Sequence, residues 1–428
     1  MSINRSRQPG IVSFGKPEFP NAVTSQLSNG IPVYLLRAGS REVSRIEFSF
    51  QAGSWYQHKA LQAGLTNAML VQGSKGYSAA AIAEWFDFHG AYLQPSADQH
   101  LGQINAVALS RHWRELLPVM ADVLQNPVFP EEAFQMVLNQ KRKSFLVENQ
   151  KIRVQCLKKF SQVLFGPQHP YAQNVTMEDY ERITRDDLLD FARDNYLRGV
   201  PELFVSGCFD DDLLTMLETY FGGIVLFEKK KQHSNLPEIR ESAEHFVRVS
   251  HPGSMQSAIR IGRRLVGKSH SDYFPLQILI TVLGGYFSSR LMQNIREEKG
   301  YTYGIGAGFY DLLHEGYMVI STEVNGEYER ATIDEIFKEI ALLREKPIGD
   351  AELSRVKKYL KGEFLRDFDG PFALEQAFRE VHDFGIDSGH YDSYWESLEQ
   401  VDSDSLMKMA RKYLNEDDLF VVVAGGNQ

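Results

Sequence analysis

The architecture follows from one repeated segment, Ile183-Thr184-Arg185-Asp186-Asp187-Leu188-Leu189-Asp190-Phe191-Ala192-Arg193, which recurs 218 residues later as Val401-Asp402-Ser403-Asp404-Ser405-Leu406-Met407-Lys408-Met409-Ala410-Arg411. Each copy continues through a Tyr-Leu pair into an apolar run that ends in glycine, at Gly207 and at Gly425. A second match, the Phe-Leu pair at 145–146 with the pair at 364–365, has an offset of 219 residues. Two matches in the same order at nearly one offset predict a duplicated domain of about 200 residues.

The duplication sets the expected domain boundaries. We expect a first domain over residues 1–226 and a second over residues 244–428. The polar residues 227–243, with three consecutive lysines and Pro237, are typical of a linker between the two.

Each repeat is predicted to be a mainly antiparallel sheet flanked by helices. Ser28-Asn29-Gly30 predicts a hairpin turn, and the alternation from Arg45 to Phe50 predicts a strand with one solvated face. Apolar residues at helical spacing predict helices over 79–89 and 111–124, and Pro127 and Pro130 precede a long predicted helix over 131–147. Strands and helices in this arrangement indicate an α+β fold rather than a doubly wound parallel sheet.

Composition excludes several classes of protein. The chain has 428 residues, 43% of them apolar and 24% charged, and a formal net charge of −10. These are globular values, and the acidic balance argues against nucleic-acid and anionic-membrane partners. The two cysteines, Cys156 and Cys208, exclude a disulfide framework. Residues 1–10 lack a signal-peptide pattern, and no apolar run approaches the ~20 residues that span a bilayer, so we expect a cytoplasmic protein.

One short stretch of the sequence matches a nucleotide-binding motif. Residues Gly262 to Ser269 fit the phosphate-loop pattern G-x-x-x-x-G-K-[ST], in which backbone N–H groups wrap the phosphates and Lys268 meets their charge. The pattern requires a strand that ends at Gly262 and a helix that begins at Gly-Lys-Ser. Ser271 or Asp272 is a better helix N-cap, and a strand followed by a loop is the favoured structure here.

A longer motif occupies residues 283–303: Leu283-Gly284-Gly285-Tyr286-Phe287-Ser288-Ser289-Arg290-Leu291-Met292-Gln293-Asn294-Ile295-Arg296-Glu297-Glu298-Lys299-Gly300-Tyr301-Thr302-Tyr303. It resembles the C-terminal-domain signature of the M16 (insulinase/pitrilysin-like) zinc peptidases, L-G-G-x-x-S-x-L-x-x-x-x-R-E-x-K-G-x-x-Y. His169-Pro170-Tyr171 and the duplicated halves extend the resemblance over nearly the whole chain. The resemblance implies the two-domain fold of that family and a link to peptide-bond hydrolysis.

The resemblance also implies roles for Arg296 and Tyr303, because an arginine and a tyrosine seven positions apart project into the active site in that family. Both side chains donate hydrogen bonds that suit the oxyanion formed during peptide hydrolysis. The alternative is structural: Arg296 pairs with Glu297 or Glu298, and Tyr303 is a strand residue in a core.

The zinc motif of the family is absent. Active members carry H-x-x-E-H on a helix of the first domain, with two histidine ligands and a glutamate base. The matching helix here, anchored on Gly73-Ser74, has Gly64 and Ala68 at the ligand positions and Asn67 at the base position. The helix expected to supply a third ligand, residues 134–147, contains no glutamate. We therefore expect no metal in this chain.

The remaining histidines and cysteines do not rebuild a catalytic centre. No His-x-x-x-His pair occurs, and neither cysteine has a histidine nearby in sequence. We expect His89 and His100 each to be solitary, with no second histidine nearby. His245 and His251 lie too far apart to hold one ion.

In some bacterial M16 members, the residues of the active site are distributed over two chains. One carries the zinc motif and the other keeps only the arginine–tyrosine pair. This sequence resembles the second kind, so we expect a heterodimer in which zinc belongs to an H-x-x-E-H partner. An inert peptide-binding or assembly scaffold of the same fold is the alternative.

A weaker implication of the resemblance concerns peptide binding. In the family, substrate adds to an edge strand of the first domain, and the matching stretch is 90–96, with Tyr92, Leu93 and Gln94 as its candidate contacts. Pro95 is tolerated on an edge strand but not in a central one.

Overall fold

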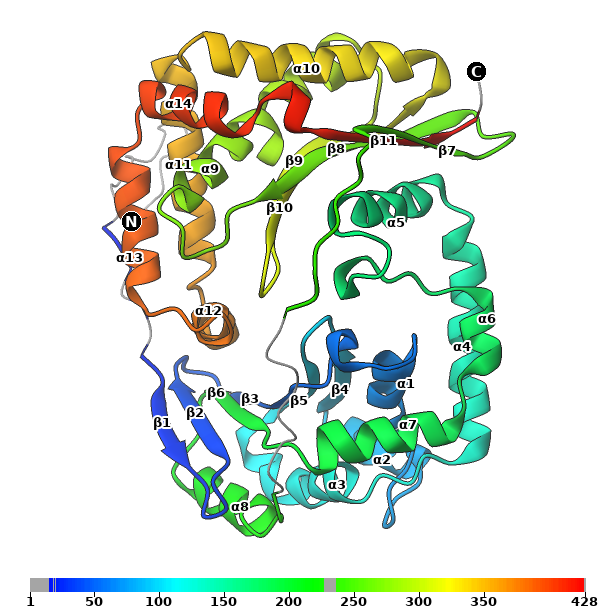
Figure 1. The fold of residues 1–428 in the computed structure, drawn as a ribbon. Helices are drawn as coiled ribbons and strands as arrows, with labels where there is room; N and C mark the ends of the chain where they lie inside the picture. The colour runs from blue at the N-terminus through cyan, green and yellow to red at the C-terminus, as the bar shows by residue number, and fades with distance from the viewer. Residues whose placement is uncertain (1–14, 18, 20, 227–235, 427–428) are drawn as a thin grey trace, which may run out of the picture.

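The computed structural model describes residues 15–17, 19, 21–226 and 236–426, and it shows two sheets, one above the other in Figure 1. The first sheet has the order β1-β2-β6-β3-β5-β4. Its strands are β1 (Val23–Gln26), β2 (Pro32–Arg37), β3 (Val43–Phe50), β4 (Tyr92–Ala97), β5 (Gly102–Leu109) and β6 (Glu202–Gly207). The second sheet has the order β7-β11-β8-β10-β9. Its strands are β7 (Phe246–Ser250), β8 (Gln256–Leu265), β9 (Ile305–Asp311), β10 (Gly316–Asn325) and β11 (Phe420–Gly425).

The two sheets share one topology. Each contains a single parallel pair, β2 with β6 and β7 with β11, at the same place in the strand order, and the other pairs are antiparallel. Only β1 has no counterpart among the described strands. The predicted α+β fold with two duplicated domains is confirmed.

Helices flank both sheets, and the three that were predicted over 79–89, 111–124 and 131–147 are present. Those of the first half are α1 (Gln62–Met69), α2 (Ala79–Phe88), α3 (Trp113–Gln125), α4 (Glu131–Asn149), α5 (Ile152–Phe165), α6 (Met177–Arg182), α7 (Arg185–Ala192) and α8 (Asp212–Phe221). Those of the second half are α9 (Tyr273–Ile280), α10 (Glu329–Glu345), α11 (Asp350–Arg366), α12 (Pro371–Asp383), α13 (Gly389–Gln400) and α14 (Ser403–Tyr413). Two π-helical segments, η5 (Thr281–Gly285) and η6 (Met292–Glu298), follow α9.

The repeated segments form α7 and α14, and both begin with the same device. Thr184 and Asp187 exchange side-chain and backbone hydrogen bonds across the first turn of α7, and Asp402 and Ser405 do the same in α14. Such a capping box satisfies N–H groups that lack a partner inside the helix. The sequence repeat therefore marks an equivalent helix start in each half.

The halves exchange one helix each. Helix α5 of the first half lies against the second sheet, where Cys156 and Phe160 join a buried cluster with Val319 and Val422. Helix α12 of the second half lies against the first sheet, as Figure 1 shows. The long helices α4 and α11 run between the two sheets in Figure 1. Helix α4 leads to α5, and α11 leads to α12. Each sheet is therefore covered in part by a helix from the other half of the chain.

The strand predicted at Arg45–Phe50 exists, but its polar face is not solvated. Glu47 is 7% exposed and Ser49 is 3% exposed, because α12 covers that face of the first sheet. The alternation reflects one apolar face and one face that makes polar contacts with another helix.

The expected linker is described only in part, since residues 227–235 lie outside the described residues. After them, Arg240 N–H donates to the Phe165 carbonyl (3.2 Å) and Ser242 N–H donates to the Val163 carbonyl (2.9 Å). This part of the connection runs along the end of α5. Among the described helices, none has the length and apolar character needed to cross a membrane.

Candidate functional site

Tyr303 lies on a short loop whose backbone is fixed. The Thr302 hydroxyl donates to the Glu323 carbonyl (2.7 Å), and the Thr322 hydroxyl donates to the Gly304 carbonyl (2.9 Å), so β10 holds the loop on both sides of Tyr303. Tyr303 is nevertheless 99% exposed. A fixed backbone that presents a bare phenol to solvent is suited to a hydrogen bond with a molecule outside this chain.

Arg296 lies on η6, which Asn294 anchors by donating to Glu335 (2.9 Å) and to Glu339 (2.7 Å). The Arg296 guanidinium lies 5.0 Å from the ring centroid of Phe287, a side chain that is 65% exposed. Among the described residues, no carboxylate lies within ion-pair distance of Arg296. The structural alternative, with Arg296 paired to a neighbouring glutamate and Tyr303 in a core, is therefore wrong.

The positions that carry zinc ligands in active relatives lie on α1. Gly64 has open space where a side chain would project, and Ala68 packs beside the first core. The Asn67 amide is buried and donates to the Gln103 carbonyl (3.1 Å) and to the Tyr196 hydroxyl (3.1 Å). Neither Gly64 nor Ala68 offers a donor atom, and Asn67 uses its amide to hold α1 against β5. These residues do not fit a zinc ion.

A cavity of about 1040 Å³ lies between the two halves, and Gly64 forms part of its wall. The first half also contributes Phe50 and His100, and the second half contributes Leu312 and Phe384. The degenerate α1 thus faces an internal space that both repeats enclose.

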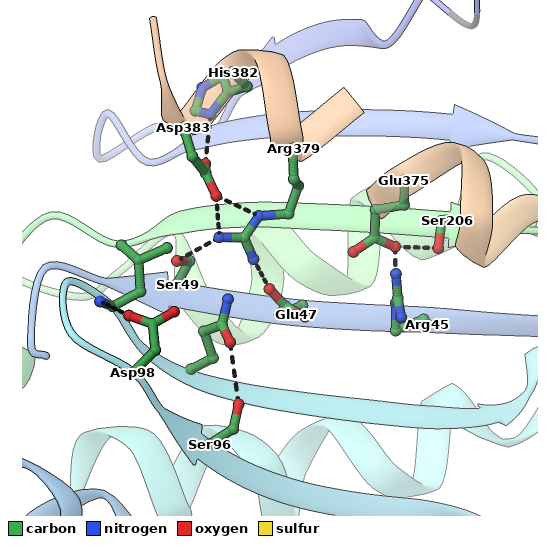
Figure 2. Close-up of polar contacts among 12 residues, drawn as sticks. Arg45, Glu47, Ser49, Ser96, Asp98, Ser206, Glu375, Arg379, His382 and Asp383 are labelled. Atoms are coloured by element: carbon green, nitrogen blue, oxygen red, sulfur yellow. Dashed lines mark hydrogen bonds and ion pairs between the residues drawn. The ribbon is translucent and has the colours of Figure 1, made fainter. Parts of the chain in front are cut away.

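Polar side chains join α12 to the first sheet across this region (Figure 2). Arg379 forms a buried ion pair with Glu47 and also binds Asp383 (2.8 Å) and Ser49 (3.2 Å). One helical turn earlier, Glu375 accepts hydrogen bonds from Arg45 (2.9 Å) and from Ser206.

Within the described residues, Glu202, His382 and Asp383 form the one group of at least three potential ligands close enough to share a metal ion. His382 Nε2 lies 3.5 Å from Glu202, and its Nδ1 lies 3.0 Å from Asp383. Arg379 already occupies the second oxygen of Asp383, so the group connects α12 to β6 through the contact between His382 and Glu202, and we call this connection the clasp. The hydrogen bond to Asp383 raises the pKa of His382 against the effect of burial, and burial raises the pKa of Glu202.

His100 is not the solitary residue that the sequence indicated. Its Nε2 lies 2.8 Å from the Tyr171 hydroxyl, and its ring lies 5.2 Å from His314 and 5.0 Å from Trp55. Burial, followed by the neighbouring His314, lowers the pKa of His100 to about 4. The His169-Pro170-Tyr171 motif therefore contributes to a contact between the halves, since His314 precedes β10. Residues more than 140 positions apart meet here, and sequence spacing gives no signal of that.

His89 is also not solitary, because its ring lies 5.1 Å from His112.

The phosphate-loop interpretation is wrong. Gly262 lies in the middle of β8, which continues to Leu265, so no loop begins there. The Lys268 side chain is 4% exposed and forms an ion pair with Glu380. The next helix, α9, starts only after its N-cap Asp272, as the helix-capping pattern predicted.

The stretch expected to meet a peptide is an edge strand, as predicted. β4 pairs with β5 alone, and the side chains of Tyr92 and Gln94 are exposed while Leu93 is partly buried.

Comparison with known proteins identifies the family. Residues 33–160 match the family model described as Insulinase (Peptidase family M16), and residues 182–360 match the model described as Peptidase M16 inactive domain. The chain belongs to peptidase family M16. Among M16 proteins it is of the inactive type, since α1 lacks H-x-x-E-H.

Relatives agree with this assignment. The "Uncharacterized zinc protease YmxG" of Bacillus subtilis is 24% identical over 304 residues, or 69% of this chain and 72% of the relative. The "Mitochondrial-processing peptidase subunit beta" of Saccharomyces cerevisiae is 22% identical over 441 residues, which cover 95% of this chain and 92% of that one. The solved "peptidase M16 inactive domain from Pseudomonas fluorescens" superimposes with a TM-score of 0.84 at 22% identity, covering 95% of this chain and 99% of that one.

Proposed function

We propose that this chain is the non-catalytic subunit of a heterodimeric M16 zinc peptidase. It supplies Arg296, Tyr303 and half of the substrate chamber to a partner that carries H-x-x-E-H, zinc and the general base. The proposal is best supported by three features of the described residues: Arg296 has no carboxylate partner there, Tyr303 is fully exposed, and α1 offers no metal ligand. The yeast relative is itself named as one subunit of a processing peptidase.

The proposed chemistry assigns both side chains to oxyanion binding. The partner's zinc would activate a water molecule, and addition of that water to a peptide carbonyl would place negative charge on the carbonyl oxygen. A guanidinium stays protonated at any working pH, and a phenol donates its proton without ionising. Donors aimed at that oxygen stabilise the transition state more than the substrate, so they raise kcat rather than lower KM.

The test combines this chain with an M16 chain that contains H-x-x-E-H. Tyr303→Phe and Arg296→Ala are each expected to lower kcat for peptide cleavage about 100-fold, with KM changed little. Arg330→Ala is the matched arginine control, because Arg330 is 82% exposed and pairs only with Asp334 in the same helix, among the residues that the structure describes. Tyr220→Phe, on α8 of the other half, is the tyrosine control.

Two outcomes would overturn the proposal. One is a complex in which both site variants retain the wild-type kcat. The other is proteolysis by this chain alone with stoichiometric bound zinc. Sedimentation of each variant with the partner separates lost catalysis from lost assembly.

The inert scaffold remains the second candidate. The exposed edge of β4, with Tyr92 and Gln94 at the surface, favours peptide binding without chemistry. This function predicts that a labelled peptide binds while no H-x-x-E-H partner gives cleavage.

A further inference from the structure

We propose that Arg260 and Arg153 form a carboxylate-binding subsite beside Tyr303, and that it selects peptides with a Glu or Asp side chain. The inference rests on the proposed function, because it takes Tyr303 as a group that faces the substrate. The proposed subsite specifies a class of substrate, peptides with an acidic side chain, which neither the family match nor the arginine–tyrosine pair indicates.

The sheet register places Arg260 on the inner face of the second sheet. Arg260 on β8 lies opposite Ser321 on β10 and opposite Val422 on β11. Val422 belongs to the cluster that α5 covers, so Arg260 shares its face with α5. The charge of Arg260 opposes the effect of burial on Cys156 of α5, whose pKa is raised to about 12. Arg260 also lines one cavity together with Arg153 at the start of α5, which places it beside that helix.

Arg260 lacks the partners that its neighbour on the same face has. Four residues later, Arg264 pairs with Glu241 (2.7 Å) and with Glu315 (3.0 Å). In the part of the chain that the structure describes, no carboxylate lies within 4.0 Å of the Arg260 guanidinium. A partly buried cation loses part of its hydration, and among the described residues no paired carboxylate compensates Arg260 for that loss. An incoming carboxylate restores that interaction.

The cavity next to Arg260 has space for such a group. It measures about 480 Å³, and its polar lining residues include Arg153, Gln256, Arg260, Tyr303, Ser321 and Glu323. Two arginines and one acidic residue, the exposed Glu323, line this cavity, so its lining carries a net positive charge. Arg153 is 56% exposed and lies only loosely against Glu148, at 3.9 Å.

The chemistry of these groups favours a carboxylate over other polar ligands. A guanidinium offers two parallel N–H donors that match the two oxygens of a carboxylate. Tyr303 lines the same cavity, so this subsite lies next to the proposed oxyanion donor. The acidic side chain is therefore expected within a few residues of the scissile bond.

Binding to the full-length chain tests the subsite without any partner. The probes are fluorescein-labelled peptides with amidated C-termini, identical except for one Glu or Gln, with affinity measured by fluorescence anisotropy at low salt. We expect the Glu peptide to bind about tenfold more tightly, and the difference to shrink in 0.5 M salt. A Gln peptide with a free C-terminus shows whether a terminal carboxylate is accepted instead.

Substitutions of the lining residues are expected to change the preference for the Glu peptide in opposite directions. Arg260→Gln abolishes the preference for Glu, Arg153→Gln reduces it, and Glu323→Gln increases it because a competing carboxylate is removed. Arg263→Gln is the control, since Arg263 lies on the opposite face of β8 and pairs with Asp418 (2.7 Å). Thermal melting confirms that each variant is folded.

The subsite is overturned if Glu and Gln peptides bind alike, if Arg260→Gln leaves the preference intact, or if Glu323→Gln weakens it. The proposal is also overturned if the Gln peptide with a free C-terminus binds as tightly as the amidated Glu peptide, because the site would then recognise the C-terminal carboxylate of a peptide. These failures differ from failure of the proposed function, which is read from kcat of Tyr303→Phe in the complex.

Discussion

Arg379 on α12 forms a buried ion pair with Glu47 on β3, 332 residues earlier in the chain. Both side chains are 9% exposed, and the Arg379 guanidinium also binds Asp383 and Ser49. The pair therefore lies where the helix of one half covers the sheet of the other (Figure 2).

Removing one member of this pair should destabilise the protein strongly. Arg379→Met leaves the Glu47 carboxylate buried without its cation, which costs about 3–5 kcal/mol in comparable sites. The double variant Arg379→Met with Glu47→Met should recover part of that loss. Urea unfolding followed by circular dichroism measures both. Arg330→Met is the surface control and should change the free energy of unfolding by less than about 1 kcal/mol.

The clasp between α12 and β6 should weaken as the pH rises. The hydrogen bond to Asp383 raises the pKa of His382 above 6.5, and burial raises that of Glu202 above 4.5. A raised folded-state pKa gives stability that is complete below the unfolded-state value and is lost as the pH rises through the folded-state value. The melting temperature should therefore fall from pH 6 to pH 8, and less so in His382→Gln. An equal slope in that variant would contradict the assignment.

The contact around His100 should respond to pH in the opposite direction. Burial lowers the pKa of His100 to about 4, so the folded protein holds this imidazole neutral. Stability is then lost as the pH falls below 6.5, because the unfolded chain takes up the proton first. The melting temperature of the wild type should drop between pH 6.5 and pH 4.5. His100→Gln, which keeps a donor near Tyr171, should flatten that drop.

Removal of metal ions by a chelator should affect this chain and the proposed zinc-binding partner differently. With Gly64 and Ala68 at the ligand positions, EDTA is expected to leave the melting temperature of the isolated chain unchanged. If the proposed heterodimer exists, the same treatment should abolish its peptide cleavage, and added zinc should restore it. Elemental analysis of both samples completes the measurement. A fall in melting temperature of the isolated chain would show a structural metal in this chain.

The repeated helix starts and the hairpin turn could be predicted from the sequence because each depends on local patterning, whereas the edge strand β4 followed from the resemblance to the family, with which Pro95 is compatible. Capping residues, a turn sequence and a proline act within a few residues of their position. The signature at residues 283–303 likewise indicated Arg296 and Tyr303, through its resemblance to the family motif. The mistaken expectation about the polar face of β3 shows the limit of such patterning, since the alternation around Glu47 carries no sign that α12 covers it.

The amino-acid sequence alone determined the family, the duplication, and the loss of metal ligands on α1, because these are properties of residue identity and order. Only the tertiary structure decided that Tyr303 stands free, that Arg260 has no counter-ion among the described residues, and that His100 meets His314. Those facts depend on strand register and on the exchange of α5 and α12 between the halves. Contacts between residues more than 100 positions apart arise when both halves pack together, and short-range spacing carries no record of them.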